Sequence, residues 1–462
     1  MDGQISPHSD VIEALRAELG DRLSTGASIR DLHGRDEAYS TPHLPDAVAF
    51  PETTEEVSRI MALCHAHRCP VVPFGIGSSL EGHVIPLQGG ISIDTSRMNR
   101  VLAVHEADLD AVVQPGVTRK QLNEELRATG LMFTVDPGAN ASLGGMAATR
   151  ASGTNAVRYG TMRENVLALE VVLADGRVIR TGTRARKSAA GYDLTHLFLG
   201  SEGTLGIITA LTVRLFGQPE RISAATCAFP DVPAAVDTVI LAIQSGLPMA
   251  RIELLDEVQM RGMALYNPDL DMPEAPHLFL EFHGTEAGVA EQVAQFREIA
   301  EEHGASEFRW ATKTEDRTRL WEARHNAYYA AQALRQGAKG VVTDSCVPIS
   351  ALAEAIARTK SAIAEAGLIA PLVGHVGDGN FHLSILVDPE AADEVAAAKA
   401  LASRVSHIAL ELGGTVTGEH GVGTGKMGYM RDEHGDALDV MADIKRALDP
   451  LNLMNPGKIV EV

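Results

Sequence analysis

The segment Leu372–Leu386, read as LVGHVGDGNFHLSIL, decides how the C-terminal half of the chain is interpreted. Apolar, strand-like runs flank its polar centre, Gly377–Asn380. An Asp-Gly pair between alternating hydrophobic residues is a strong hairpin signal, because Gly adopts a positive φ at no steric cost. A chain reversal at this point places His375 and His382 opposite each other on paired strands. Two imidazoles on a rigid hairpin are ligands that suit a divalent metal.

A second motif, Thr417–Gly421 (TGEHG), adds a carboxylate and another imidazole, with glycines that let the backbone approach a ligand closely. We therefore consider that His375, His382 and Glu419 bind a metal with open coordination positions. In this hypothesis His420 is a base beside the metal. The alternative is that these are structural histidines, because the chain contains 17 His and chance pairs will occur. Spacing alone leaves both interpretations open.

Length and composition set the broad class of the protein. A chain of 462 residues is long enough for two domains, each with its own core. Hydrophobic residues make up 45% and charged residues 22%, which is ordinary for a soluble globular enzyme. The formal net charge of -21 argues against nucleic acid or an anionic membrane as a partner. No apolar run is long enough for a transmembrane helix, and the N-terminus resembles no signal or transit peptide, so we expect a cytoplasmic protein.

The four cysteines, Cys64, Cys69, Cys227 and Cys346, are too scattered for a disulfide framework. The Cys64–Cys69 segment (CHAHRC) has a metal-like appearance, but no second pair of ligands matches it. We interpret these thiols as buried or incidental.

The N-terminal half begins with a polar arm, residues 1–40, that contains one amphipathic helix around Asp10–Leu19. A strand at 47–50 follows, and then a helix that starts with a capping box at Thr53. The apolar strand 70–74 leads directly into a glycine-containing loop.

That loop, Gly75–Ser79, exposes a row of backbone N–H groups at a strand end, which makes a good anion cradle. It is no Walker A loop, since no Gly-Lys-Ser/Thr follows. It is no dinucleotide fingerprint either, because Leu80 stands where the third Gly should be. Taken alone, the loop is better interpreted as a plain turn.

A long glycine-rich run, residues 136–160, favours ligand binding over a plain turn. Its glycines are interleaved with small and apolar residues, whereas a mobile linker would be rich in Ser, Pro and charge. Such a run predicts backbone wrapped closely about a large ligand. Around it we expect strands at 91–93 and 111–114, a helix at 118–130, a hairpin at 165–179 and a strand at 197–208 that is broken by glycines.

The composition changes after about residue 219. Alanine-rich amphipathic helices (about 232–245, 286–303, 315–335, 351–366 and 391–412) alternate with strands such as 278–283 and 341–347. This pattern predicts an α+β domain built on an antiparallel sheet. The expected domains are the arm (1–40), a first domain (41–219), a second domain (220–445) and a C-terminal segment (446–462) that packs back on the first domain.

Taken together, several motifs resemble the vanillyl-alcohol-oxidase/PCMH superfamily of flavoproteins. The motifs are PFGIGSS (73–79), DPGA (136–139), GGMAAT (144–149), GSEGTLGII (200–208), the 375–382 hairpin, GEHG (418–421) and NPGK (455–458). Within the superfamily the chain is similar to the FAD-dependent D-lactate dehydrogenases. Glycolate oxidase catalytic subunits and D-2-hydroxyglutarate dehydrogenases are relatives.

This resemblance implies an α+β, two-domain PCMH-type FAD-binding fold with a C-terminal α+β substrate domain on an antiparallel sheet. It also implies a set of FAD-binding residues in the glycine-rich motifs: Pro73, Gly75, Ile76, Gly77, Ser78, Ser79, Pro137, Gly138, Ala139, Gly144, Gly145, Ala148, Ser152, Gly153, Asn155, Tyr159, Gly160, Glu202, Gly203, Gly206, Ile207, Ile208 and Asn455. Some members tether FAD through a His near the first loop. Here Leu80 occupies that region and His83 is the imidazole nearby, so we expect non-covalent FAD.

The resemblance further implies oxidation of a D-2-hydroxy acid to the 2-oxo acid, with a divalent metal (Zn, Mn or Fe) on His375, His382 and Glu419. His420 is then the general base. Arg324 would bind the substrate carboxylate, although spacing alone favours a surface Arg on an amphipathic helix. Three further residues complete the expected substrate site: Asn380, which is otherwise a turn residue, and Tyr328 and Val342, which favour an apolar substituent.

Other functions remain open at this point. The chain is alternatively the catalytic subunit of a glycolate oxidase complex or a D-2-hydroxyglutarate dehydrogenase. A metal-dependent hydrolase whose glycine loops are only turns, or a non-catalytic flavin or metal carrier, are rivals from other classes. The expected electron acceptor is a cytochrome, a quinone or an electron-transfer flavoprotein, and a homodimer is compatible with the resemblance.

Overall fold

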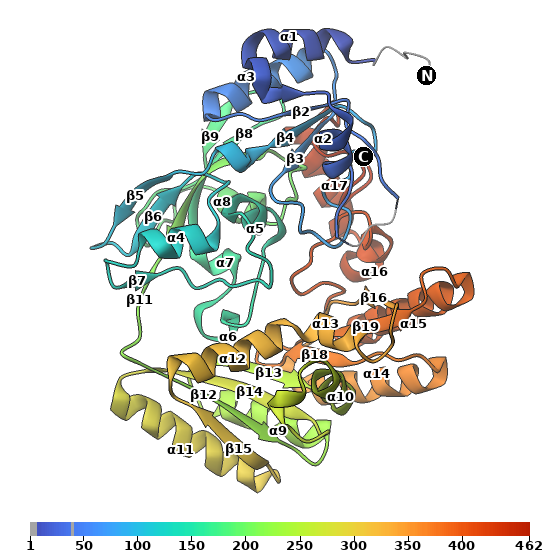
Figure 1. Ribbon diagram of the computed structural model, residues 1–462. Coiled ribbons are helices and arrows are strands. Elements are labelled where there is room, and N and C mark those ends of the chain that lie inside the picture. Colours follow the sequence, from blue (N-terminus) through green and yellow to red (C-terminus); the bar gives the residue numbers. More distant parts are fainter. Residues whose placement is uncertain (1–6, 38–40) are drawn as a thin grey trace. The chain divides into compact units, whose positions relative to one another are not determined.

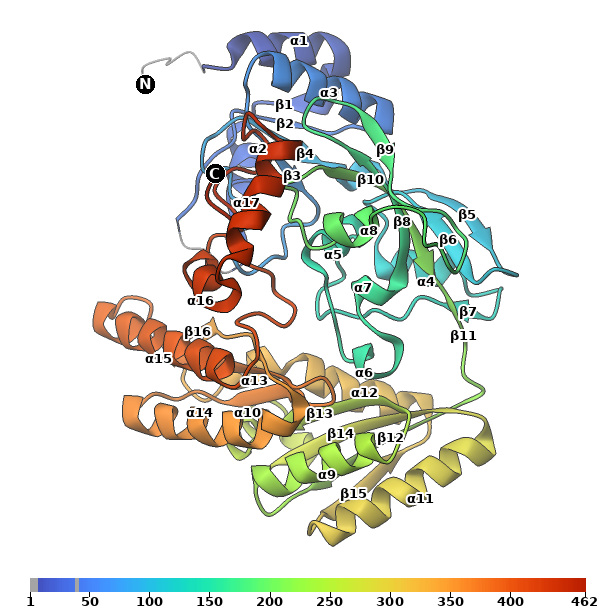
Figure 2. The same cartoon turned by 180° about the vertical axis from the view of Figure 1, so that it is seen from behind.

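The computed structural model describes residues 7–37 and 41–462, and these form two compact units. The first unit extends to Ser152 and also includes Gly160–Gln218 and Glu419–Val462. The second unit comprises Gly153–Tyr159 and Pro219–Gly418. Figures 1 and 2 show the elements of both units from opposite sides.

A four-stranded sheet in the first unit carries the predicted anion loop. Its order is β1 (Leu23–Ser24), β2 (Ala47–Ala49), β4 (Ile91–Asp94) and β3 (Val71–Phe74), with β2, β4 and β3 parallel. The helices α1 (Ser9–Leu19) and α3 (Thr54–Ala66) bury their apolar residues in the same core. The Thr53 side chain accepts the Glu56 N–H and starts α3 where the capping signal predicts. The short elements η1 (Gly20–Arg22), α2 (Ala27–Leu32) and η2 (Thr95–Arg97) complete this part.

The second sheet of this unit is antiparallel, in the order β5 (Val101–His105), β6 (Asp110–Val113), β10 (Ile207–Arg214), β8 (Val166–Val172) and β9 (Val178–Arg180). The predicted hairpin between β8 and β9 is confirmed. The strand predicted at 197–208 is wrong, because helix α8 (Leu194–Phe198) precedes a loop and β10 begins only at Ile207. Glu202 and Gly203 have φ of 53° and 71°, which extended strands do not allow.

The remaining elements of the first unit are short. They are α4 (Arg119–Glu125), β7 (Leu131–Met132), α5 (Leu143–Thr149), α7 (Met162–Asn165), β11 (Phe216–Gly217), η5 (Met427–Tyr429), α16 (Met430–His434) and α17 (Ala437–Leu448). The helix predicted at 118–130 is therefore shorter than expected. Near the C-terminus, Val71 on β3 donates its N–H to Leu453 and accepts the Asn455 N–H. The chain returns to the first unit at Glu419 rather than at residue 446, because Thr424 and Gly425 donate their N–H groups to the Glu81 carbonyl.

The second unit is built on an eight-stranded sheet, which confirms the predicted antiparallel α+β architecture. Its path is β15 (Ser306–Ala311), β12 (Arg221–Ala228), β14 (His277–Gly284), β13 (Met249–Leu255), β18 (Leu372–His375), β19 (Asn380–Val387) and β16 (Lys339–Val342). The short strand β17 (Ser345–Cys346) also pairs with β19. The predicted hairpin is the β18–β19 pair, with Gly379 at φ 79°.

Helices cover both faces of this sheet (Figure 2). One face packs against α9 (Val232–Gln244), α11 (Glu286–Glu302), α14 (Leu352–Ala366) and α15 (Ala392–Glu411). The other face packs against α10 (Glu257–Tyr266), α12 (Thr314–His325) and α13 (Ala327–Gln332). The single helix predicted at 315–335 is divided at Asn326, and the strand predicted at 341–347 is divided at Thr343 and Asp344. The unit also contains α6 (Ala156–Tyr159), η3 (Pro268–Leu270) and η4 (Ile349–Ala351).

Strand alternation gives the two faces different chemistry. Ile252 and Leu254 of β13 belong to the large core beneath α9, α11, α14 and α15. Their neighbours Arg251 and Glu253 therefore point to the face of α10, α12 and α13. The same alternation on β18, β14 and β19 puts His375, Glu281, His283 and His382 on that face, so one side of the sheet collects the polar side chains.

Within residues 7–37 and 41–462, none of the helices combines the length and hydrophobicity that spanning a membrane requires. The cysteines predicted to be incidental are free thiols, and Cys64, Cys69 and Cys227 are buried.

Candidate functional site

The two hairpin histidines are diagonal neighbours rather than a directly opposed pair. His382 is opposite Val373, and His375 is opposite Asn380. Alternate residues of a strand share a face, so both imidazoles lie on the same side of the sheet. Their ring centroids are 5.4 Å apart with the planes at 83°. The hairpin thus brings the two rings together as expected, in a different register.

Each imidazole is oriented through its Nδ1 atom. His375 Nδ1 is 2.7 Å from Glu253 Oε1, and His382 Nδ1 is 3.0 Å from the Thr343 carbonyl oxygen. A carboxylate and a carbonyl only accept hydrogen bonds, so Nδ1 carries the proton in both rings. The nitrogen that would bind a metal is then Nε2 in each case. Metal-binding histidines characteristically donate their other ring N–H to a carboxylate or a backbone carbonyl.

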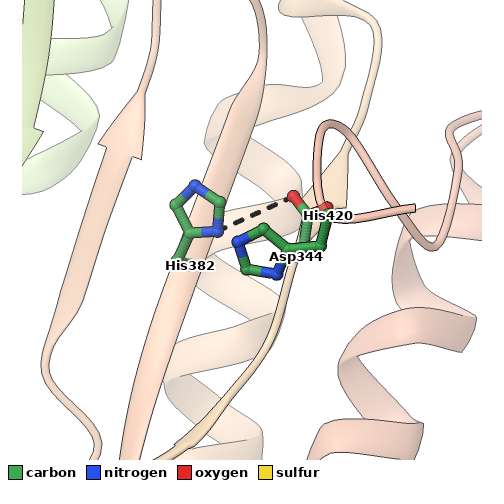
Figure 3. Close-up of side chains that lie close together, drawn as sticks. All are labelled: Asp344, His382 and His420. Atoms are coloured by element: carbon green, nitrogen blue, oxygen red, sulfur yellow. Dashed lines mark ion pairs between the residues drawn. The ribbon is translucent and has the colours of Figure 1, made fainter. Parts of the chain in front are cut away.

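Asp344 is a further polar group at this place that the sequence did not indicate. Its side chain is buried, and its Oδ1 lies 3.6 Å from His382 Nδ1 (Figure 3). The Asn380 amide donates to Oδ1 at 2.7 Å, and the Thr417 hydroxyl donates to Oδ2 at 2.8 Å. Asp344 lies in the two-residue break between β16 and β17, and that break was missed because the segment was predicted as one strand.

Arg324 is 8% exposed on α12, so the alternative of a surface arginine is wrong. Its Nε and Nη2 atoms both donate to Glu253 Oε2, at 3.0 and 2.6 Å. This side-on contact uses one edge of the guanidinium. The edge formed by Nη1 and Nη2 is the one on which a second carboxylate could bind end-on.

Glu253 is thus shared between His375 and Arg324, and sequence reasoning missed it. Burial favours the neutral acid, but His375 and Arg324 outweigh burial and hold the pKa of Glu253 below its usual value. The available signal was an Arg and a Glu at alternate positions of the otherwise apolar segment 249–255. An alternating pattern of this kind predicts a strand whose second face carries charge.

The other predicted substrate residues also lie in the second unit. Asn380 is 5% exposed, and its amide also donates to the Ser345 carbonyl at 3.0 Å, as a residue that stabilises the hairpin would. The Tyr328 ring, on α13, lies against β16, where a Cβ added to Gly340 would be 2.9 Å from it. Val342 shares this face of β16 because it is two residues further along the strand.

Glu419 and His420 belong to the first unit, immediately after the chain leaves the second unit at Gly418. His420 Nδ1 is 4.0 Å from Glu81 Oε1, and Lys426 Nζ is 3.3 Å from the same oxygen. The predicted base therefore has an acid and a cation from its own unit close by.

Glu202, predicted to bind the cofactor, uses its buried carboxylate for the protein backbone. It accepts the N–H groups of Val422 and Gly423 at 2.7 and 2.8 Å, and His83 Nε2 lies 3.4 Å from its Oε1. Burial opposes a charge on His83, but Glu202 outweighs it and raises the pKa of His83. Burial likewise opposes the charge on Glu202, and His83 together with the two N–H groups lowers the pKa of that carboxyl. The pair anchors the loop that follows His420.

The predicted anion loop faces the start of α5. A Cβ on Gly75 would lie 2.6 Å from Ser142 Oγ, so the 75–79 loop and the glycine-rich run approach each other closely. Ser142 precedes α5, but its hydroxyl does not cap the helix. The hydroxyls of Ser79 and Ser142 are buried without a hydrogen-bond partner among the described residues. Two such donors in a glycine-lined cradle suit the phosphate oxygens of a dinucleotide.

Several predicted cofactor glycines are required by packing within the protein. A Cβ on Gly144 would lie 2.4 Å from Pro115, on Gly203 it would lie 2.6 Å from Pro73, and on Gly206 it would lie 2.5 Å from Val171. Ile207 and Ile208 bury their side chains in two hydrophobic cores. Residues with side chains committed in this way can reach a cofactor only through the backbone.

Gly138 differs from these glycines, because nothing lies within 4 Å of the Cβ position. It stands between Pro137 and Ala139 ahead of α5. Gly77, Gly145, Ala148, Ser152 and Gly160 also lie in the first unit, as do Ile76 and Ser78. Asn455 donates its amide to the backbone carbonyls of His83 and Glu202, at 2.9 and 2.7 Å, and so ties the tail to the same loops.

Three residues predicted to bind the cofactor, Gly153, Asn155 and Tyr159, belong to the second unit. Arg251 Nε donates to Asn155 Oδ1 at 3.0 Å, and Tyr159 Oη lies 2.7 Å from His283 Nδ1. His283 Nε2 in turn lies 2.8 Å from Glu281 Oε1. This end of the glycine-rich run is thereby fixed to the polar face of the sheet.

Comparison with known proteins identifies the relatives of the chain. The family described as "FAD linked oxidases, C-terminal domain" matches residues 218–459, and "FAD binding domain" matches residues 45–182. A probable mitochondrial D-lactate dehydrogenase of Danio rerio is 52% identical over 98% of this chain and 92% of its own length. The mitochondrial D-lactate dehydrogenase [cytochrome] of Arabidopsis thaliana is 46% identical over 98% and 80%. Glycolate oxidase subunit GlcD of Bacillus subtilis is 35% identical over 90% and 89%.

Solved structures confirm the PCMH-type fold. p-Cresol methylhydroxylase superposes with a TM-score of 0.80 at 20% identity, covering 99% of this chain and 98% of that one. 4-Ethylphenol oxidase from Gulosibacter chungangensis gives a TM-score of 0.79 at 19% identity, with the same coverage. The chain belongs to the FAD-linked oxidase family that includes the D-lactate dehydrogenases, and its first unit contains that family's FAD-binding domain.

Proposed function

We propose that this chain oxidises a D-2-hydroxy acid, D-lactate or a longer monocarboxylic analogue, to the 2-oxo acid with FAD and a divalent metal. The names of the similar enzymes from Danio rerio and Arabidopsis thaliana support the substrate class. The observation that carries the proposal is the pair of imidazoles on β18 and β19, each with Nδ1 bound to an acceptor. That arrangement makes Nε2 the atom of each ring that would bind a metal.

The first unit would hold FAD through the 75–79 loop and the glycine-rich run. When bound, FAD supplies the acceptor for the C2 hydride, which is the chemistry of the cofactor. The buried hydroxyls of Ser79 and Ser142 would donate to phosphate oxygens. We expect the cofactor to be non-covalent, because Leu80 follows the loop and His83 is buried beside Glu202.

A metal would be held by His375, His382 and Glu419, which follows Gly418 directly in the chain. When bound, it supplies a Lewis acid that lowers the pKa of a coordinated hydroxyl and orients the substrate. Zn, Mn and Fe all accept this set of two imidazoles and a carboxylate. Arg324 would bind the substrate carboxylate on its Nη1–Nη2 edge, while Glu253 holds its other edge. His420 would take the proton from the substrate hydroxyl, a role worth about 10² to 10⁴-fold.

Substrate size would be set by Tyr328 and Val342 on the same side of β16. Neither carries a positive charge, so a second carboxylate buried there would lose its water without gaining a partner. An apolar substituent would gain about 0.8 kcal/mol per buried CH₂. Asn380 would contribute a hydrogen bond to the substrate only through Oδ1, since its amide nitrogen already binds Asp344 and Ser345.

The test is a series of kcat/KM values with an artificial dye as electron acceptor. D-Lactate and D-2-hydroxybutyrate should exceed D-2-hydroxyglutarate and D-malate, and the L-enantiomers should be poor. A higher value for D-2-hydroxyglutarate than for D-lactate would show that Tyr328 and Val342 do not form the pocket. A glycolate-specific enzyme that is inactive alone would instead support a subunit role, as in the GlcD relative.

A second test concerns the cofactor and the natural acceptor. Acid precipitation should release FAD into the supernatant, and colour retained in the pellet would contradict non-covalent binding. We propose that electrons pass from FAD to a cytochrome, a quinone or an electron-transfer flavoprotein rather than to NAD. The cytoplasmic location also remains a prediction, because the first relatives are described as mitochondrial.

A further inference from the structure

Glu253 is the residue of the second unit that touches both halves of the proposed substrate site. Its Oε1 binds His375 Nδ1 at 2.7 Å, while its Oε2 accepts from Arg324 Nε and Nη2. Only 1% of Glu253 is exposed. It stands within β13, which is paired on both sides, with β14 and with β18. The carboxylate is therefore held by a strand in the interior of a sheet rather than by a loop.

We propose that Glu253 is a positioning residue that couples the metal ligand His375 to the carboxylate anchor Arg324. The proposal rests on the function stated above and adds a residue that holds two of its parts in register. Glu253 fixes His375 with its proton on Nδ1, which leaves Nε2 as the atom for the metal. It simultaneously fixes the guanidinium so that the Nη1–Nη2 edge is the one presented to a substrate carboxylate.

A carboxylate is the group that this position requires. Its two oxygens both accept, and here each accepts from a different partner. Glutamine has the same shape but one acceptor and one donor. If its NH₂ faces His375, then Nδ1 must accept, and the proton of the neutral ring moves to Nε2, where it blocks the metal. If its NH₂ instead faces Arg324, the amide N–H groups and the guanidinium N–H groups face each other in a buried environment, and neither finds an acceptor there.

Because the site is buried, the carboxylate at position 253 is difficult to replace. Arg324 is 8% exposed, and Glu253 is the acceptor for both of its hydrogen bonds in the second unit. An amide at 253 would leave a buried cation without its counter-charge, which is costly in a dry environment. Glu253→Gln should therefore weaken two binding events: that of the metal, through His375, and that of the substrate carboxylate, through Arg324.

The experiment compares full-length wild type, Glu253→Gln and a control, Asp256→Asn. Asp256 is a buried carboxyl that directly follows β13, but it holds the N-terminus of α10 by accepting the Gln259 N–H. Asparagine caps helices about as well, so this control changes a neighbouring buried acid outside the proposed site. Affinity for Zn²⁺ and Mn²⁺ is measured by competition with a chelating indicator after metal removal, and FAD content is read from the absorption spectrum.

We expect Glu253→Gln to weaken metal binding by about 10- to 100-fold, the range typical of lost partners of metal-binding histidines. KM for D-lactate should rise in the metal-saturated enzyme, and FAD content should match wild type. Asp256→Asn should bind metal as wild type does. Unchanged metal affinity in Glu253→Gln would overturn the proposal, and so would equal weakening in both variants.

A double substitution separates positioning from general stability. In an Arg324→Met background, Glu253→Gln should still weaken metal binding by a similar factor, because its route to the metal runs through His375 and does not depend on an unpaired Arg324. Unchanged metal affinity in that background would overturn the coupling. If Glu253→Gln does not fold, Glu253→Asp replaces it; it keeps both acceptors but withdraws them by one methylene, and it should also weaken metal binding. A wild type that binds no metal would contradict the proposed function itself, which is a different outcome from any of these.

Discussion

Buried charged side chains have different partners in the two units. In the first unit they bind backbone as well as charged partners: Glu202, which pairs with His83, accepts from the Val422 and Gly423 amides, and Lys445, which pairs with Asp449, donates to the carbonyls of Thr204 and Met454. Lys458 donates to the carbonyl of Ile85. On the polar face of the sheet in the second unit they bind other side chains: Glu253 pairs with His375 and Arg324, and Glu281 pairs with His283 and accepts from Trp321.

The contrast follows from how each unit satisfies the hydrogen-bonding groups of its backbone. Long loops in the first unit leave carbonyl and N–H groups outside any helix or strand, and buried charges stabilise them. The sheet of the second unit satisfies its own backbone, so charged side chains on its polar face are left to pair with each other. A unit of the first kind suits a large ligand wrapped by main chain, and one of the second kind suits a small polar substrate.

The largest expected effect tests whether metal binding can be lost while FAD binding is kept. His382→Ala should abolish metal binding and most turnover, because it removes an imidazole, while the FAD absorption spectrum stays intact. Metal analysis and the flavin spectrum of the same preparation measure both. His420→Ala is the matched variant, and it should keep the metal while losing turnover. Equal loss of metal in the two variants would make His420 a ligand instead of a base.

The prediction of intermediate size concerns Lys458, whose buried amino group binds the backbone carbonyl of Ile85. Burial lowers the pKa of Lys458 to about 8 from an ordinary 10.5. Between these values the unfolded chain binds the proton and the folded chain does not, so stability should rise with pH from about 8 to 10. The full span is worth about 3 kcal/mol.

Lys458→Met should remove this rise. Urea unfolding of wild type and variant at several pH values measures it, and only the pH dependence of their difference is interpreted, because the variant also loses the bond to Ile85. A difference that is flat from pH 7.5 to 10 would mean that Lys458 titrates as an ordinary lysine.

The smallest expected effect asks whether open space beside a glycine belongs to the cofactor. Gly138→Ala places a Cβ where no protein atom lies within 4 Å, so the apoprotein should keep its stability. FAD affinity should fall by about tenfold, the effect of about 1.4 kcal/mol, if the cofactor occupies that space. Gly217→Ala is the control, because its Cβ position is equally open and lies at β11. Equal FAD affinity in both variants would place the cofactor away from Gly138.

Local features of the fold were predictable because local signals specify them. The capping Thr53, the β8–β9 hairpin and the β18–β19 hairpin all depend on neighbours within a few residues. The strand predicted at 197–208 failed because apolar composition does not reveal that Glu202 adopts a left-handed conformation. The break at Asn326 was missed for a similar reason, since both halves of that segment favour helix.

The candidate site was predictable only in part. The glycine-rich motifs predicted a flavin-binding region, and the match to an FAD-binding domain confirms it. The metal site at the hairpin histidines stays a prediction. Glu253 was missed because its partners are 71 and 122 residues away, and nothing local ties it to them. Asp344 was missed because its importance comes from Asn380 and Thr417, which reach it from other segments.

The second unit is nested within the first along the chain, and this has a consequence for synthesis. All of its residues, from Gly153 to Gly418, leave the ribosome before Glu419–Val462, which the first unit needs. During translation at about 5–20 residues per second, the eight-stranded sheet can form while β3 still lacks its contact with Met454. The unit that contains the first translated residues is thus the last to be completed, and the second unit can fold before it.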